Sequence, residues 1–183
     1  MHDQYKLVLK EIESVLEKSD FTQIDSFVTT IINSKKIVVF GAGRVGLVMK
    51  SFGMRLNHLD IDSYFLGDVN VPKLGPDDLL LIGSGSGNTS SVANIVEIAT
   101  KNKIKVMCIT ANRESRILKH SCNYILLNCQ TKESLGEQRF SKQPMTTLFE
   151  QSLSIFLDSL VLILMALKKE TNESMLERHN ILE

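Results

Sequence analysis

The strongest constraint on the fold of this chain is an alternation, from residue 35 onward, of short apolar runs with helical segments. Five runs are apolar almost throughout and favour strands, at 36–40, 62–66, 78–82, 105–110 and 124–127. Helical periodicity follows at 45–56, 89–101 and 147–169. Strands that are apolar on both faces and alternate with helices indicate a parallel sheet covered on both sides. The alternation therefore predicts an α/β fold.

The predicted architecture is a three-layer α/β/α sandwich around a five-stranded parallel sheet, doubly wound as in flavodoxin-like folds. Two helices are expected before the sheet, within the first 33 residues. The first has its apolar residues at helical spacing, from Tyr5 to Leu16. Asp20 is expected to cap the second, with Gln23 three residues further on. Without an internal repeat or linker, residues 1–183 are expected to form a single domain.

Composition excludes several classes of protein. Apolar residues make up 43% of the 183 residues, which excludes intrinsic disorder. Lys plus Arg and Asp plus Glu both number 21, so no excess of positive charge favours nucleic acid or an anionic membrane as a partner. Three cysteines without a C-x-x-C pair, and four histidines without metal-ligand spacing, indicate a reduced protein with no metal site. With no targeting segment visible, a cytoplasmic location is expected.

The longest apolar stretch, 153–167, is interrupted by Ser154, Asp158 and Ser159. It is shorter than the roughly 20 residues needed to span a bilayer, so we expect a buried helix or a subunit interface rather than a membrane segment. Six apolar residues are predicted to exceed what one sheet face covers and to build a homo-oligomer: Leu153, Phe156, Leu157, Leu160, Val161 and Leu164.

The loop after the first predicted strand, 41–46, fits the pattern G-x-G-x-x-G. One interpretation is a dinucleotide-binding turn, which also needs an acidic residue at the end of the second strand. Asp62 lies at the wrong end of that strand and Asp68 lies beyond it. A second interpretation is a tight turn for helix packing. We favour the wall of a sugar-phosphate site, with Gly43 and Arg44 as candidate ligands, because a guanidinium binds phosphate or hydroxyl oxygens well.

The loop after the third strand, 83–90, is a more specific signal. Alternate glycines let its backbone turn N–H groups inward, several hydroxyls add donors, and the next helix directs its positive end at the loop. This combination suits a phosphate monoester, and the absence of a P-loop lysine argues against nucleotide hydrolysis. The alternative is that the hydroxyls are only helix caps. The candidate phosphate-binding residues are Ser84, Gly85, Ser86, Gly87, Asn88 and Thr89.

A strand, S-G-S-G-x-T and a helix in succession resemble the sugar isomerase (SIS) domain. More narrowly, the chain resembles the 6-phospho-3-hexuloisomerases of that family, in order and over nearly its whole length. The resemblance rests on GAGR at 41–44, RLNHL at 55–59, SGSGNT at 84–89, QPM at 143–145 with LFEQ at 148–151, and RH at 178–179 with LE at 182–183.

The resemblance implies an enzyme that interconverts D-arabino-3-hexulose 6-phosphate and D-fructose 6-phosphate in the ribulose monophosphate route of formaldehyde fixation. It implies a phosphosugar partner, a homotetramer and active sites shared between neighbouring subunits. The reaction proceeds through a cis-enediol and needs no cofactor. Two alternatives stay open: another small SIS isomerase, such as one making a heptose phosphate, and a sugar-phosphate sensor without catalysis.

Three residues are the catalytic candidates. The resemblance places the base at Glu150, whereas the spacing Thr147-x-x-Glu150 also fits a capping box. His179 and His58 are candidates for moving protons between substrate oxygens, since an imidazole titrates near neutral pH. Their alternatives are an inert exposed tail for His179 and a helix C-terminus for His58. If either histidine enters an active site, that site is expected to be the one of a neighbouring subunit.

Overall fold

The computed structural model describes residues 2–130 and 141–182, and it confirms the α/β fold with a five-stranded parallel sheet. The strands are β1 (Ile37–Gly41), β2 (Ser63–Phe65), β3 (Leu79–Ser84), β4 (Lys105–Thr110) and β5 (Asn123–Leu126). The helices are α1 (His2–Glu17), α2 (Ile24–Ile32), α3 (Gly43–His58), α4 (Ser90–Lys101), α5 (Thr147–Lys168) and α6 (Asn172–Glu177), with a 3₁₀ helix η1 (Arg116–His120).

The strand order β2-β1-β3-β4-β5 makes β1 and β3 neighbours in the middle of the sheet. The chain winds outward from this pair in both directions, so the topological switch point lies between β1 and β3. Their register aligns Gly41 with Gly83. The two glycine-rich loops therefore leave the sheet side by side at its carboxyl edge.

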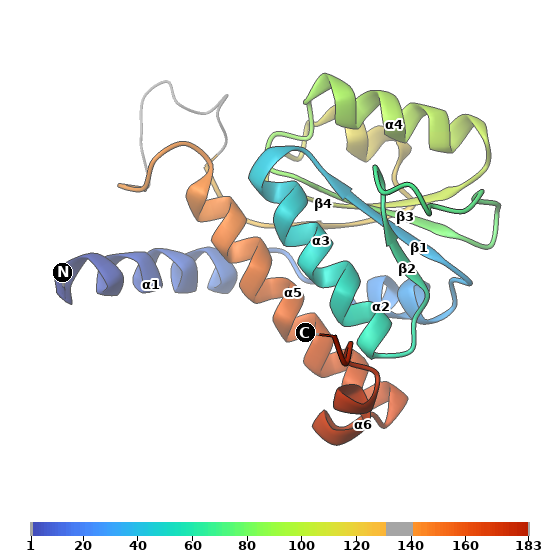
Figure 1. Ribbon diagram of the computed structural model, residues 1–183. Helices are drawn as coiled ribbons and strands as arrows, with labels where there is room; N and C mark the ends of the chain where they lie inside the picture. Colours follow the sequence, from blue (N-terminus) through green and yellow to red (C-terminus); the bar gives the residue numbers. More distant parts are fainter. Residues whose placement is uncertain (1, 131–140, 183) are drawn as a thin grey trace.

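The helices form a layer on each face of the sheet (Figure 1). Successive residues of a strand face opposite sides. Val39 thus packs in a core with α1, α2, α3 and α5, whereas Val38 packs in a second core with α4 and η1. Both faces of the sheet are buried, which explains why the strands are apolar throughout.

Helix α5 covers the sheet with the six residues that the sequence analysis assigned to a subunit interface. These residues are 0–7% exposed inside the chain, so that assignment is wrong. A different set of apolar residues on α5 faces outward: Ile155, Leu162, Ile163 and Leu167. The error arose because a helix that covers a sheet beside α1 and α3 buries a wide stripe of its surface.

The length argument against a membrane span is also wrong. Helix α5 has 22 residues and is apolar enough, by length and composition, to cross a bilayer. However, 56% of its most apolar 18-residue window is buried inside the protein. We therefore interpret α5 as a core helix.

Two local predictions need correction. Asp20 does not cap α2, because the helix begins at Ile24 and has Gln23 as its N-cap residue, without a side-chain cap bond. The Asp20 carboxylate instead accepts hydrogen bonds from the N–H and hydroxyl groups of Thr22. The sequence analysis also missed α6, which begins with a capping box formed by Thr171 and Ser174. The predicted irregular stretch at 130–146 lies partly outside the described residues.

Candidate functional site

The loop after β3 is folded by its own hydroxyls. The Gly87 N–H donates to Ser84 Oγ at 3.1 Å, and the Asn88 N–H donates to Ser86 Oγ at 3.2 Å. A hydroxyl that accepts a backbone N–H keeps its own proton for another acceptor. Ser84 and Ser86 can therefore brace the loop and still donate to phosphate oxygens.

The loop after β4 supports this candidate phosphate loop. Asn112 Nδ2 donates to the Ser86 carbonyl at 3.1 Å, and Asn88 Oδ1 accepts the Arg116 N–H at 2.9 Å. Asn112 could not be predicted from the sequence, because a single amide 26 residues away from its partner forms no sequence pattern. Asn88 thus has a bracing role that its position in the loop did not predict.

Close packing explains two of the glycines. Gly87 has a φ of +62°, and a Cβ there would lie 2.4 Å from the Ser115 Cβ. A Cβ at Gly85 would lie 3.3 Å from the Phe149 ring. The phosphate loop is therefore held between η1 on one side and the start of α5 on the other.

Thr89 is the N-cap residue of α4, but its side chain makes no cap hydrogen bond. The alternative in which this hydroxyl serves only as a helix cap is therefore wrong for Thr89. Thr89 is exposed and lies at the N-terminus of α4, where the first backbone N–H groups of the helix have no carbonyl partner within the helix.

The loop after β1 combines tight packing with an open wall. A Cβ at Gly46 would lie 2.4 Å from the Gly41 carbonyl oxygen, so α3 packs closely on its own loop. Gly43 has a φ of +58° and open space where a Cβ would stand. A dinucleotide site would need an acidic residue at the end of β2 to bind the ribose. Asp62 lies before β2 and the Asp68 carboxylate pairs with Lys50 at 2.8 Å, so neither residue is placed to do so.

Glu150 lies at the carboxyl edge of the sheet, in the first turn of α5. Its side chain is 9% exposed, and Oε2 accepts a hydrogen bond from Arg44 Nε at 2.5 Å. Oε1 accepts one from the Thr146 hydroxyl at 2.9 Å. The adjacent Phe149 packs on the phosphate loop, and Arg44 follows the neighbouring loop after β1. A carboxylate, a guanidinium and the N–H and O–H donors of the phosphate loop therefore lie at the same edge of the sheet.

The structure excludes the capping box at Glu150. The N-cap residue of α5 is Thr146 rather than Thr147, and it forms no side-chain cap bond with the helix backbone. Glu150 is one residue too far along, and its N–H already donates to the Thr146 carbonyl at 3.1 Å. Its carboxylate has no role in capping the helix.

The two candidate histidines lie together, but away from Glu150. Their ring centroids are 5.3 Å apart. Arg178 donates to the His58 carbonyl at 3.0 Å, and this bond holds the C-terminal tail on α3. Arg178 also forms an ion pair with Glu170. His58 ends α3 and Arg44 stands at its start, about 21 Å away along the helix axis at 1.5 Å per residue. A single subunit therefore does not bring the histidines to the Glu150 site.

Glu11 of α1 anchors the segment that leads into α5. Its carboxylate accepts hydrogen bonds from the Ser141 hydroxyl, the Lys142 N–H and Gln143 Nε2. Burial raises the pKa of Glu11, but the bonds from Lys142, Ser141 and Gln143 outweigh it and hold that pKa below its usual value. This contact has no sequence signal, since it joins residues 130 positions apart.

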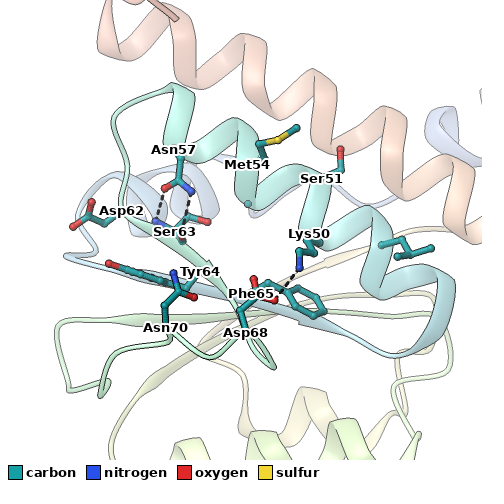
Figure 2. A pocket seen from close by; sticks show the side chains of 12 residues that line it. Lys50, Ser51, Met54, Asn57, Asp62, Ser63, Tyr64, Phe65, Asp68 and Asn70 are labelled. Atoms are coloured by element: carbon teal, nitrogen blue, oxygen red, sulfur yellow. Dashed lines mark hydrogen bonds and ion pairs between the residues drawn. The ribbon is translucent and has the colours of Figure 1, made fainter. Parts of the chain in front are cut away.

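A pocket of about 540 Å³ lies elsewhere, between the outer flank of α3 and β2 (Figure 2). At one end, Lys50 pairs with Asp68 and stands 5.2 Å from the centre of the Phe65 ring. At the other end, the Asn57 amide binds both the N–H and the carbonyl of Ser63 and closes the edge of the sheet there. The lining of this pocket holds two carboxylates, Asp62 and Asp68, beside its one lysine, so it is a poor place for a phosphate.

Residues 2–130 and 141–182 contain no group of three or more His, Cys, Asp or Glu side chains arranged to hold a metal ion. Burial raises the pKa of the Cys108 thiol to about 12, so Cys108 is not a reactive nucleophile.

Comparison with known proteins finds a family model and full-length relatives. Residues 30–167 match the model of the SIS domain family. A Bacillus subtilis protein named 3-hexulose-6-phosphate isomerase is 35% identical over 176 residues, which cover 96% of this chain and 95% of that one. A Methanocaldococcus jannaschii protein of the same name is 32% identical over 160 residues, which cover 86% and 82% of the two chains.

A solved structure is similar over the whole chain. It is a hypothetical protein from Methanococcus jannaschii, whose structure is described as inferring a function of 3-hexulose-6-phosphate isomerase. It superposes with a TM-score of 0.84 at 30% identity and covers 99% of both chains. By its family match and its full-length relatives, this chain belongs to the SIS domain family.

Proposed function

We propose that this protein is a phosphosugar isomerase that interconverts D-arabino-3-hexulose 6-phosphate and D-fructose 6-phosphate. The observation that carries the proposal is the Glu150 carboxylate beside the phosphate loop, in contact with Arg44. Relatives named for this reaction support the choice of substrate. With that substrate, the protein serves the ribulose monophosphate route of formaldehyde fixation in the cytoplasm.

The reaction moves a carbonyl from C3 to C2. A base removes the proton from C2, and the electron pair of that bond forms the C2–C3 double bond of an enediol while O3 gains a proton. The O2 proton then leaves, and C3 receives a proton. Glu150 is the proposed base for both carbon centres, and its position beside the loop that binds the phosphate keeps it on one face of the sugar. The step needs no electron acceptor, and hence no redox cofactor.

Ser84, Ser86 and Thr89 are the proposed phosphate ligands, together with the backbone N–H groups of the loop. Replacing Ser86 by Ala is expected to weaken binding of fructose 6-phosphate by about 1–3 kcal/mol, because a hydrogen bond to a charged group is lost. Isothermal titration measures this change. Equal affinity in the wild type and the variant would remove Ser86 from the phosphate site.

The histidines suggest how the subunits cooperate. We propose that residues 1–183 form one SIS domain and assemble as a homotetramer, in which His58 and His179 of one subunit enter the site of another. The distance of these rings from Arg44 within one chain supports this arrangement, and so do the exposed apolar residues of α5.

Light scattering tests the assembly. We expect a tetramer, and we expect replacement of Leu162 by Glu to shift the protein towards smaller species, because this side chain is 67% exposed on α5. Ile98→Glu is a matched control, since Ile98 is 60% exposed on α4 in the opposite layer. A wild-type monomer at micromolar concentration would contradict the proposal.

Incubation with fructose 6-phosphate, followed by NMR, tests the reaction. The proposal predicts a 3-hexulose 6-phosphate product that forms without added cofactor and in the presence of a chelator. Binding without turnover would favour the alternative of a sugar-phosphate sensor. Turnover of another phosphosugar, but not of this one, would favour a different SIS isomerase.

A further inference from the structure

The two oxygens of the Glu150 carboxylate have partners of different kinds. Oε1 accepts from the Thr146 hydroxyl and Oε2 from Arg44 Nε. Thr146 lies one helical turn before Glu150, and its carbonyl also accepts the Glu150 N–H. Thr146 is thus fixed relative to Glu150 by the backbone of α5, whereas Arg44 comes from α3 on a long side chain.

Exposure separates the two partners further. The Arg44 side chain is 67% exposed, but that of Glu150 is only 9% exposed. A guanidinium in water exchanges partners readily and binds anionic oxygens well, whether they belong to a carboxylate or a phosphate. Arg44 is therefore the removable partner of Glu150, and Thr146 is the permanent one.

Arg44 also occupies the oxygen that a substrate proton would have to reach. Oε1 is held by Thr146 within its own helix turn, so Oε2 is the oxygen available for chemistry once Arg44 has left. A phosphosugar bound at the neighbouring loop brings anionic and hydroxyl oxygens to the same place. These substrate oxygens can replace the Glu150 carboxylate as the hydrogen-bond partner of Arg44, so that Glu150 is free to act as the base.

We propose, on the basis of the function proposed above, that Thr146 is a positioning residue for Glu150 and that the substrate releases Glu150 Oε2 by taking over Arg44. The proton of C2 then passes to Oε2 while its bonding electron pair forms the C2–C3 double bond. Thr146 keeps the carboxylate plane fixed throughout. Substrate binding and exposure of the base are thereby coupled.

The first test compares Thr146→Val with Thr146→Ser, and uses Thr147→Val as the matched control at the next position. Thr146→Val keeps the shape but removes the hydroxyl, so kcat is expected to fall about 5–50-fold while KM stays within about twofold. Ser is expected to restore kcat, and Thr147→Val to leave it unchanged. The melting temperature should not move with kcat across the series.

Solvent exchange isolates the proton-transfer step. In D₂O, the enzyme is expected to place deuterium at C3 of fructose 6-phosphate, and Thr146→Val should slow this exchange by the same factor as kcat. A kcat for Thr146→Val within about twofold of wild type would overturn the positioning role, given the usual effect of a misplaced group. So would a loss in Thr146→Ser as large as that in Thr146→Val.

Arg44→Met tests the exchange of partners. The variant is expected to raise KM about 10-fold or more, since the substrate loses one hydrogen bond to a charged group. Exchange at saturating substrate is expected to persist, because Glu150 is no longer bound by Arg44. Loss of exchange even at saturation would overturn this part. An active Glu150→Gln variant would instead defeat the proposed base itself, whereas an inactive one beside a normal Thr146→Val would defeat only the present inference.

Discussion

Replacement of Glu150 by Gln is expected to lower turnover by about 10²–10⁴-fold, the usual contribution of a positioned base. The amide has nearly the same shape, and its single oxygen can still accept the hydrogen bond from Thr146. Its NH2 group cannot accept one from Arg44, and the side chain cannot take up a proton. Affinity for fructose 6-phosphate is expected to persist, because the proposed phosphate ligands lie on another loop. Turnover by NMR and affinity by titration, measured on the same preparation, separate the two effects.

Stability should change little in this variant. Glu150 does not cap α5, and its ion pair involves an Arg side chain that is 67% exposed, so the loss is expected to be about 0–1 kcal/mol. Asp77→Asn is a suitable control, since it removes an exposed ion pair with Lys35 at the amino edge of the sheet. Turnover of Glu150→Gln within about threefold of wild type would end the assignment of the base, because a general base contributes far more than this.

Replacement of Gly87 by Ala is expected to unfold the phosphate loop locally. The backbone at φ +62° costs an L-residue roughly 1–2 kcal/mol. The new methyl group would also lie 2.4 Å from the Ser115 Cβ, and such overpacking costs about 1–3 kcal/mol more. Urea unfolding should register the sum, and binding of fructose 6-phosphate should fall at least about tenfold, because the Gly87 N–H leaves Ser84.

Two further variants separate the cost of the positive φ from the cost of the steric contact with Ser115. Gly43 has a similar φ of +58° but no heavy atom within 4 Å of a built Cβ, so Gly43→Ala should show only the smaller, conformational loss of stability. Adding Ser115→Gly to Gly87→Ala removes the Cβ that collides with the new methyl group. The double variant should recover most of the stability that Gly87→Ala loses beyond the loss in Gly43→Ala. Equal losses in Gly43→Ala and Gly87→Ala would mean that the contact with Ser115 is harmless.

The sequence predicted the sheet because its strands are buried on both faces. The apolar run at 79–82 fits a strand of a parallel sheet between helices, and the strand at 105–110 has the bounds expected of it. It predicted the ends of elements less well. Helix α6 is short and mostly polar, so it carries no apolar periodicity, and Asp20 has a capping sequence but uses its carboxylate on Thr22.

Candidate site residues could be predicted where local sequence dictates local geometry, as in the loop at 83–90. Contacts between distant segments had no sequence signal. The pairing of Glu150 with Arg44 joins residues 106 positions apart, and that of His58 with His179 depends on how the tail folds back on α3. The surface left exposed by α5 could not be derived either, because a wholly apolar helix does not reveal which neighbours cover it.

The length of α5 has a consequence for how this chain can vary. The helix rises about 33 Å over its 22 residues, carries the proposed base Glu150 in its first turn and ends just before Glu170, the partner of Arg178. One inserted residue would turn everything beyond it by about 100° and advance it by 1.5 Å. Such an insertion would displace the tail that carries His179 relative to Glu150, while leaving each end locally intact. Insertions and deletions should therefore be tolerated in the surface loops and selected against within α5, whatever residues face outward along it.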